Sequence, residues 1–237
     1  MGRGPSIEGR KNAEDARRGK IFTKLIREIT VASRTGGDPA TNARLRAGID
    51  KALSANMPKD TIERAIRRGS GAEGADNMHE VRYEGYGPSG VALIIDTMTD
   101  NAQRTVADVR HALAKHGGNL GTSGSVAFQF HRLGEIVVDT SRPGSEDKLL
   151  EAALDAGADD VQTEGGTSTV LCSPENFESV KKALVAAGFQ PQRADVVMRP
   201  ENRVAVTAEV AETLRDLLDW LEELDDVQEV YHNAELP

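Results

Sequence analysis

The side chains of this sequence that are best suited to binding a charged ligand are the lysines and arginines of its first seventy residues. Residues 1–71 contain 16 Lys and Arg against 8 Asp and Glu, a net charge of +8, whereas the remaining residues contain 13 against 30, a net charge of −17. This asymmetry is typical of a protein with one end that meets a polyanion and an acidic remainder that keeps it soluble. The alternative is that these charges lie on ordinary solvated helix faces.

The phosphates of a nucleic acid are regularly spaced charges, and a basic surface that neutralises them releases counterions. The candidate nucleic-acid-binding residues are Arg10, Lys11, Arg17, Arg18, Lys20, Lys24, Arg27, Arg34, Arg64, Arg67 and Arg68. No pattern typical of base reading accompanies them, and a helix-turn-helix is only loosely matched.

Two tyrosines, Tyr83 and Tyr86, flank a Gly-rich turn just after the basic segment. If that turn faces the basic residues, the rings could stack on unpaired bases. The alternative interpretation is that they brace the edge of a sheet.

The other reactive side chains form no recognisable catalytic or metal site. The five histidines and the single cysteine, Cys172, lack the spacing of metal ligands. The Gly-rich stretch at 117–124 lacks the Lys-Ser/Thr of a phosphate-binding loop and precedes a strand instead of a helix. No nucleophile–base motif surrounds Ser123, Ser125 or Cys172, and Cys172 is expected to be a small core residue. We therefore expect no enzyme, no metal and no cofactor, with an enzyme or small-molecule sensor as the remaining alternative.

Helices are expected to position the basic residues. Apolar residues recur with helical spacing over residues 20–34, 42–55 and 58–68, with Gly and Pro at the ends, and a short helical lead precedes residue 20. Asn56 is a candidate cap of the third helix. Helices of this size bury a common apolar centre by facing inward, so their basic rows are expected to point outward.

A Gly-rich, acidic stretch at residues 69–80 predicts a hinge or linker, and the chain then changes to an α+β pattern. Two strands around Gly-Tyr-Gly-Pro-Ser, a helix after Asn101 and a strand at 125–130 come first. Residues 135–198 follow in the order βαββαβ, which is that of a ferredoxin-like sandwich. A closing βαβ, with strands at 204–206 and 227–231, is expected to complete the sheet that begins at Val81.

The predicted fold class is therefore α+β, with an all-helical N-terminal domain followed by two α+β (ferredoxin-like) domains, one inserted in the other. The expected boundaries are 1–75 for the basic helical domain, 80–131 plus 201–237 for the discontinuous α+β domain, and 132–200 for the inserted domain. No apolar run is long enough for a membrane span, and no secretory signal precedes the first apolar residues. With one cysteine, the sequence predicts a cytoplasmic protein without a membrane partner.

A family resemblance rests on four long blocks of the chain: RGKIFTKLIREITVASRTGGDP, NARLRAGIDKALSANMPKDTIERAIRRGSG, RYEGYGPSGVALIIDTMTDN and RTVADVRHALAKHGGNLGTSGSVAF. In these blocks, and less distinctively to its C-terminus, the chain closely resembles the YebC family. The resemblance implies the same fold, a helical N-terminal domain followed by two α+β domains. Members of this family are described as probable DNA-binding transcriptional regulators in the cytoplasm. Their mitochondrial relatives are translational activators, for example of cytochrome c oxidase. Many members open with HSKWANIKHRK where this chain has MGRGPSIEGRK, so no role of that Trp or His carries over, whereas Arg10 and Lys11 keep the basic pair.

Together these observations predict a nucleic-acid-binding regulatory protein, a DNA-binding transcriptional regulator in the first instance. The alternative is a ribosome- or RNA-associated translation factor, because the same charges would bind ribosomal RNA equally well.

Overall fold

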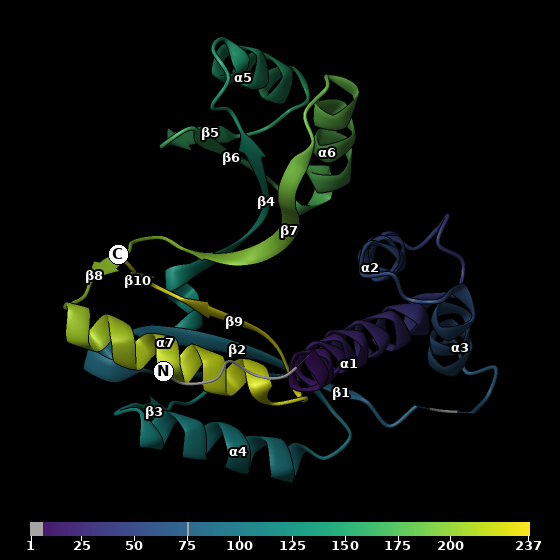
Figure 1. Ribbon diagram of the computed structural model, residues 1–237, viewed down its shortest axis with the longest axis vertical. Coiled ribbons are helices and arrows are strands. Elements are labelled where there is room, and N and C mark those ends of the chain that lie inside the picture. The colour runs from purple at the N-terminus through teal and green to yellow at the C-terminus, as the bar shows by residue number, and fades with distance from the viewer. Residues whose placement is uncertain (1–6, 75) are drawn as a thin grey trace. The chain divides into compact units, whose positions relative to one another are not determined.

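The structure is a computed structural model that describes residues 7–74 and 76–237 (Figure 1). Contacts between Cα atoms divide the chain into two compact units. The first contains residues 1–122, 206–230 and 237, and the second contains residues 123–205 and 231–236. Helices precede two four-stranded, mainly antiparallel sheets and one two-stranded sheet, so the fold class is α+β, as predicted from the sequence.

The first unit begins with three helices that share one apolar core. They are α1 (Ile7–Ala32), α2 (Ala43–Ser54) and α3 (Lys59–Gly69). Ile29, Leu45 and Ile62, one from each helix, are at most 5% exposed and pack together with Met57. The expected separation between a short lead and a helix starting at residue 20 is wrong, because one helix of 26 residues runs through both.

The turns between these helices are held by local polar contacts. The Asn42 side chain accepts a hydrogen bond from the Leu45 amide (3.0 Å) and donates to the Ala32 carbonyl (2.7 Å), so it caps α2 and ties it to the end of α1. The expected cap at Asn56 is wrong, because this residue has a φ of 61° and Pro58 occupies the N-cap position of α3. Pro58 supplies the helical φ without needing an N–H partner.

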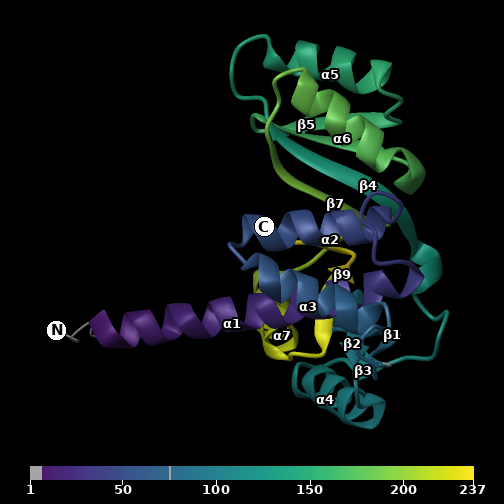
Figure 2. The same cartoon turned by 90° about the vertical axis from the view of Figure 1, so that its right-hand side faces the viewer.

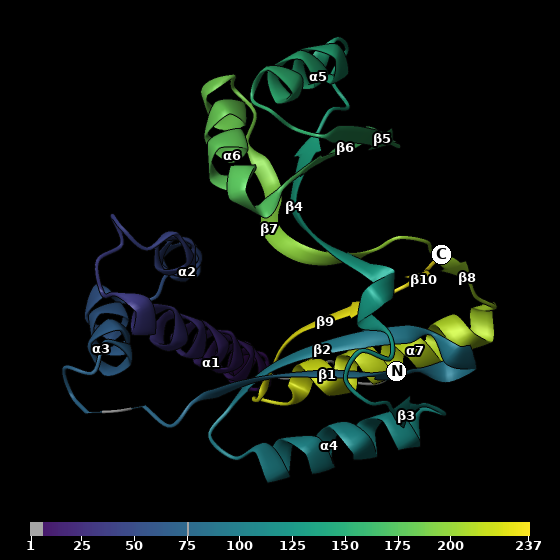
Figure 3. The same ribbon diagram turned by 180° about the vertical axis from the view of Figure 1, so that it is seen from behind.

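The sheet of the first unit has the strand order β3-β1-β2-β9. Its strands are β1 (His79–Tyr86), β2 (Ala92–Thr99), β3 (Asn119–Leu120) and β9 (Val227–His232), and its helices are α4 (Ala102–Lys115) and α7 (Ala208–Glu223). A Cβ on Gly87 would lie 3.3–3.6 Å from Leu93, Leu217 and Leu214, so the glycine lets α7 pack closely on the sheet. A Cβ on Gly85 would lie 3.2 Å from Leu113 of α4. Figure 3 shows α7 and α4 beside β1 and β2.

The strand expected at 227–231 joins this sheet as predicted, since β9 neighbours β2. The strand expected at 204–206 does not join it. Instead β8 (Val204–Ala205) pairs in parallel with β10 (Ala234–Glu235) in a separate two-stranded sheet.

The second unit contains the ferredoxin-like βαββαβ arrangement. Its elements are β4 (Phe130–Asp139), α5 (Ser145–Asp155), β5 (Asp160–Glu164), β6 (Thr167–Cys172), α6 (Phe177–Ala186) and β7 (Pro191–Pro200). The strand order β5-β6-β4-β7, antiparallel throughout, is the one that this topology predicts. Cys172 is fully buried beside Ile136 and Val180, so the expectation of a core cysteine is confirmed.

The strand expected at 125–130 is wrong, because residues Ala127–Gln129 form a 3₁₀ turn and β4 begins only at Phe130. Within the described chain, no helix combines the length and the apolar character required to cross a membrane.

Candidate nucleic-acid interface

The N-terminal half of α1 is a solvated helix that carries four cations. Residues 9–19 are all exposed, and this stretch extends beyond the part of α1 that packs on α2 and α3 (Figure 2). Arg10 and Arg17, and likewise Lys11 and Arg18, are seven residues apart and therefore lie on the same side of the helix. The side chains of these four have no hydrogen bond or ion pair to another described residue, although the Arg18 guanidinium lies 5.1 Å from the centre of the Phe22 ring. We call these four residues the α1 arm.

The last two turns of α3 contribute a second group of cations. Arg64, Arg67 and Arg68 are all at least partly exposed. Arg67 forms an ion pair with Glu73 (3.0 Å), and Arg64 lies 3.9 Å from Asp60 one turn earlier, whereas Arg68 has no ion pair within the described part of the chain. Exposed pairs of this kind hold their partners weakly, so these charges remain available to a ligand.

The middle of α1 has a different environment from the one expected. Lys20 donates to the Glu223 carbonyl oxygen (2.9 Å) and pairs with the Glu223 carboxylate, and Lys24 donates to the Glu222 carbonyl oxygen (2.7 Å). These carbonyls belong to the last turn of α7, where they have no partner within the helix and where the helix dipole attracts cations. The expectation that this basic row simply points outward is therefore wrong.

Arg27 continues this contact into the protein. Its Nη1 donates to the carbonyl oxygens of Met98 (2.8 Å) and Asp225 (3.0 Å) and pairs with Asp226 (2.8 Å). The Asp226 side chain, only 8% exposed, also accepts two hydrogen bonds from Arg104 and one from Thr105 (2.8 Å). Burial raises the pKa of Asp226, but the bonds from Arg104, Arg27 and Thr105 outweigh it and the pKa is lowered.

Asp226 thus accepts hydrogen bonds from both α1 and α4, and it lies in the loop between α7 and β9. The amide of Met98 in β2 donates to the Asp226 carbonyl (2.9 Å), which fixes the backbone of that loop. Two guanidiniums and a hydroxyl around one buried carboxylate fix the relative position of their helices, and removing one partner is costly. We call this group the Asp226 cluster.

The expected linker is attached to the helices at three points. Arg34 pairs with Asp76 and donates to the Met78 carbonyl, Arg44 joins Glu28 (2.8 Å) and Glu80 (2.6 Å), and Arg67 holds Glu73. The hydrogen bond from Arg34 lowers the pKa of Asp76 and raises that of Arg34. Arg34 is therefore engaged within the protein.

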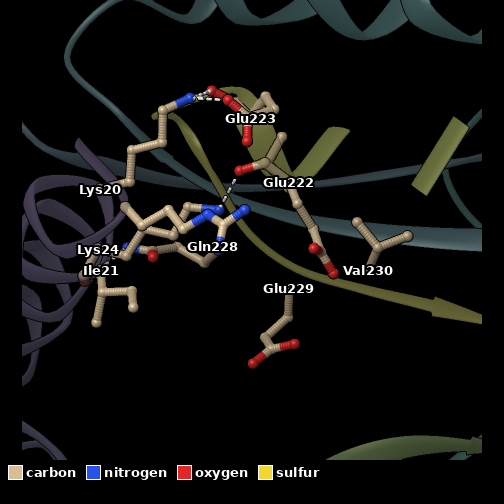
Figure 4. Close-up of a pocket in the computed structure, with 10 residues that line it drawn as sticks. Lys20, Ile21, Lys24, Glu222, Glu223, Gln228, Glu229 and Val230 are labelled. Carbon is tan, nitrogen blue, oxygen red and sulfur yellow. Dashed lines mark hydrogen bonds and ion pairs between the residues drawn. The ribbon is translucent and has the colours of Figure 1, made fainter. Parts of the chain in front are cut away.

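A groove of about 420 Å³ runs between α1 and the end of α7, with β9 alongside (Figure 4). Arg17, Lys20 and Lys24 line one side, and Glu222, Glu223 and Glu229 line the other. Burial in this groove lowers the pKa of Lys24, against the opposing effect of Glu222 and Glu229. Because these charges balance, the cations of this groove are neutralised by carboxylates of the same protein.

The two tyrosines are not brought together. Tyr83 and Tyr86 both lie in β1, three residues apart, so their rings point to opposite faces of the sheet. Both are only partly exposed, and burial, followed by the charge of Asp226, raises the pKa of Tyr83. A joint stacking platform is excluded by this geometry.

No group of His, Cys, Asp and Glu among the described residues could hold a metal ion. His111 of α4 and His116, the residue just after α4, instead contact the Trp220 ring, at centroid distances of 5.8 and 5.5 Å.

Sequence reasoning missed the residues that engage the basic row. Asp226, Glu223 and Glu222 lie in an acidic run, Glu-Glu-Leu-Asp-Asp, at the end of a helix whose apolar face is unambiguous. The available signal was the placement of four acids at a helix C-terminus, where negative charge is unfavourable unless cations compensate it.

Two family models match the chain, one after the other. The TACO1/YebC protein N-terminal domain matches residues 4–72, and the TACO1/YebC second and third domain matches residues 78–234. Together they cover the helical segment and both sheets.

Curated relatives are similar over almost the whole length. A probable transcriptional regulatory protein of Xanthomonas campestris pv. campestris (strain B100) is 58% identical, covering 99% of this chain and 98% of its own. One from Cupriavidus pinatubonensis is 57% identical, covering 97% and 95%.

A solved structure agrees with this fold. The crystal structure of a conserved hypothetical protein, Aq1575 from Aquifex aeolicus, superposes with a TM-score of 0.84 at 46% identity, covering 94% of this chain and 92% of the other. With both family models matched in order and these relatives aligned end to end, the chain belongs to the TACO1/YebC family of regulatory proteins.

Proposed function

We propose that this protein is a DNA-binding transcriptional regulator that contacts the phosphate backbone through the α1 arm. The observation that carries the proposal is the solvated N-terminal half of α1, with Arg10, Lys11, Arg17 and Arg18 exposed and without an ion pair to another described residue. Its relatives are named probable transcriptional regulatory proteins, which supports the regulatory part of the proposal.

Charge and geometry support backbone binding over base reading. Pairs of cations seven residues apart on an exposed helix follow a line of phosphates, and their long side chains reach a polyanion without a fixed pocket. The exposed cations of α3, above all Arg68, would add contacts from a second helix. Tyr83 and Tyr86 point to opposite faces of β1 and form no joint platform for unpaired bases, which favours a duplex over a single strand.

The test is a salt series of binding to a short DNA duplex, followed by fluorescence anisotropy. With four to six phosphates neutralised, the logarithm of the affinity should fall with a slope of about −4 to −5 against the logarithm of salt concentration. A flat response would contradict the proposal.

The alternative, a translation factor on ribosomal RNA, is distinguished by a parallel arm of the same experiment. Co-sedimentation with ribosomes at moderate salt, together with weak duplex binding, would identify ribosomal RNA, and not DNA, as the polyanion that the protein binds. Tight duplex binding with the protein left in the ribosome-free fraction would support the transcriptional regulator.

A further inference from the structure

The acidic turn at the end of α7 occupies the part of α1 that continues the α1 arm. Lys20 and Lys24 follow Arg17 along the same helix, and both donate to the carbonyls of Glu222 and Glu223 (Figure 4). The carboxylate of Glu223 adds an ion pair to Lys20, and this pair lowers the pKa of Glu223. An α-helix C-terminus with extra carboxylates offers cations the same chemistry as a phosphate backbone, namely clustered oxygen acceptors in a negative field.

The side chains in the contact between α1 and the end of α7 become less exposed from its outer end to its inner end. At its outer end the side chains of Lys20 and Glu223 are 37% and 71% exposed, whereas at its inner end those of Arg27 and Asp226 are 15% and 8% exposed. Exposed pairs are screened and weakly held, and buried ones are not. A competing polyanion can therefore displace the outer contacts while the Asp226 cluster stays intact.

From this arrangement we propose that residues 222–225 act as an intramolecular polyanion that masks Lys20 and Lys24 and is displaced by nucleic acid. The proposal rests on the proposed function, because it describes how the same basic surface is regulated. In the masked form the α1 arm and α3 present cations to a ligand, whereas Lys20 and Lys24 are held by the end of α7. In the open form Lys20 and Lys24 extend the binding surface by one further turn of α1.

The variant that tests the proposal is Glu222→Gln/Glu223→Gln/Asp225→Asn. It removes three exposed negative charges and leaves Asp226 in place. The matched control is Glu209→Gln/Glu212→Gln/Asp216→Asn, which removes the same three charges from exposed positions of α7 nearer its start. The two proteins have the same net charge, so a difference between them reports the masking contact and not general repulsion.

Both variants are titrated with the short DNA duplex, and with an RNA hairpin in parallel. The variant at residues 222–225 is expected to bind about five- to tenfold more tightly than the control, with a salt slope steeper by about two units for two further phosphates. Equal affinities and equal slopes would overturn the masking proposal while leaving the proposed function intact. Failure of the unaltered protein and of both variants to bind either probe would overturn both.

Hydrogen exchange distinguishes masking from a purely structural contact. When the duplex is added to the unaltered protein, backbone amides at residues 223–225 should exchange faster, since Lys20 and Lys24 leave this turn. Unchanged or slower exchange there would contradict displacement, even if the variant binds more tightly.

Discussion

Asp226 is the most buried carboxylate in the contact between α1 and the rest of the first unit. It accepts from Arg27, Arg104 and Thr105 while its own side chain is almost buried. Removing the charge leaves the Arg27 guanidinium without its carboxylate and leaves Arg104 with only the exposed Asp100, and such losses at a buried site are large. The residue is unremarkable in sequence, being one acid in an acidic run.

We expect Asp226→Asn to lower the free energy of unfolding by about 2–4 kcal/mol, measured by urea denaturation. The control is Asp100→Asn, which also removes a carboxylate from Arg104 but at a side chain that is 51% exposed. That change should lower the free energy of unfolding much less, because solvent screens an exposed ion pair. Similar losses for the two variants would show that burial of Asp226 does not govern its contribution.

The pH dependence of stability follows from the lowered pKa of Asp226. Because its pKa is lower in the folded than in the unfolded protein, its contribution is present above the unfolded value of about 4 and is lost as pH falls through the folded value. The free energy of unfolding should therefore drop below about pH 4 less steeply for Asp226→Asn than for the unaltered protein. Parallel pH profiles for the two proteins would contradict the assignment.

At the scale of elements, two glycines of the helical segment have opposite roles. A Cβ on Gly69 would lie 1.9 Å from the Thr30 carbonyl oxygen, because α3 packs tightly on α1, whereas a Cβ on Gly19 would meet nothing within 4 Å. Gly69→Ala should destabilise by about 1–3 kcal/mol through overpacking. Gly19→Ala should stabilise by up to about 1 kcal/mol, since alanine favours an exposed helix interior. Thermal melts of the two variants check this; destabilisation by Gly19→Ala would show that the α1 arm is not helical in solution.

The proposed function depends on the α1 arm. Replacement of Arg10, Lys11, Arg17 and Arg18 by alanine should weaken duplex binding by tenfold or more and reduce the salt slope by up to about 3.6 units, because each of the four lost phosphate contacts removes about 0.9. Helicity should be kept, since residues 9–19 make no core contacts.

The control for the arm removes four exposed cations from elsewhere in the chain, namely Lys115, Arg142, Lys148 and Lys182. If this control loses as much affinity as the arm variant, binding depends on overall charge and the arm is not the interface.

Local signals account for what the sequence predicted correctly at this scale. The helices expected from residue 42 and after Asn101 both begin at an asparagine whose side chain accepts from the amide three residues on, a polar residue that precedes an apolar period. The ferredoxin-like order was predictable because each strand and helix there is bounded by Gly or Pro. The errors came from contacts between distant segments: Lys24 and Glu222 are 198 residues apart, and no periodicity in either helix indicates the pairing.

At the scale of the whole molecule, the basic residues of the first segment fall into two groups. Part of the basic segment is neutralised by the acidic remainder through Lys20, Arg27, Arg34 and Arg44, and this holds the first unit together. The rest, on the α1 arm and α3, remains exposed. The net charge of the segment alone overstated the surface available to a ligand, because a sequence does not show which charges meet. The division into three domains at residues 75, 131 and 200 remains a prediction from the sequence.

The central claim, that the α1 arm contacts nucleic acid, is tested most directly by photo-crosslinking in cells followed by identification of both the crosslinked peptides and the bound nucleic acid. The account predicts crosslinks within residues 9–19, with further ones on α3, to duplex DNA. Crosslinks confined to the second unit, or none to nucleic acid at all, would contradict it.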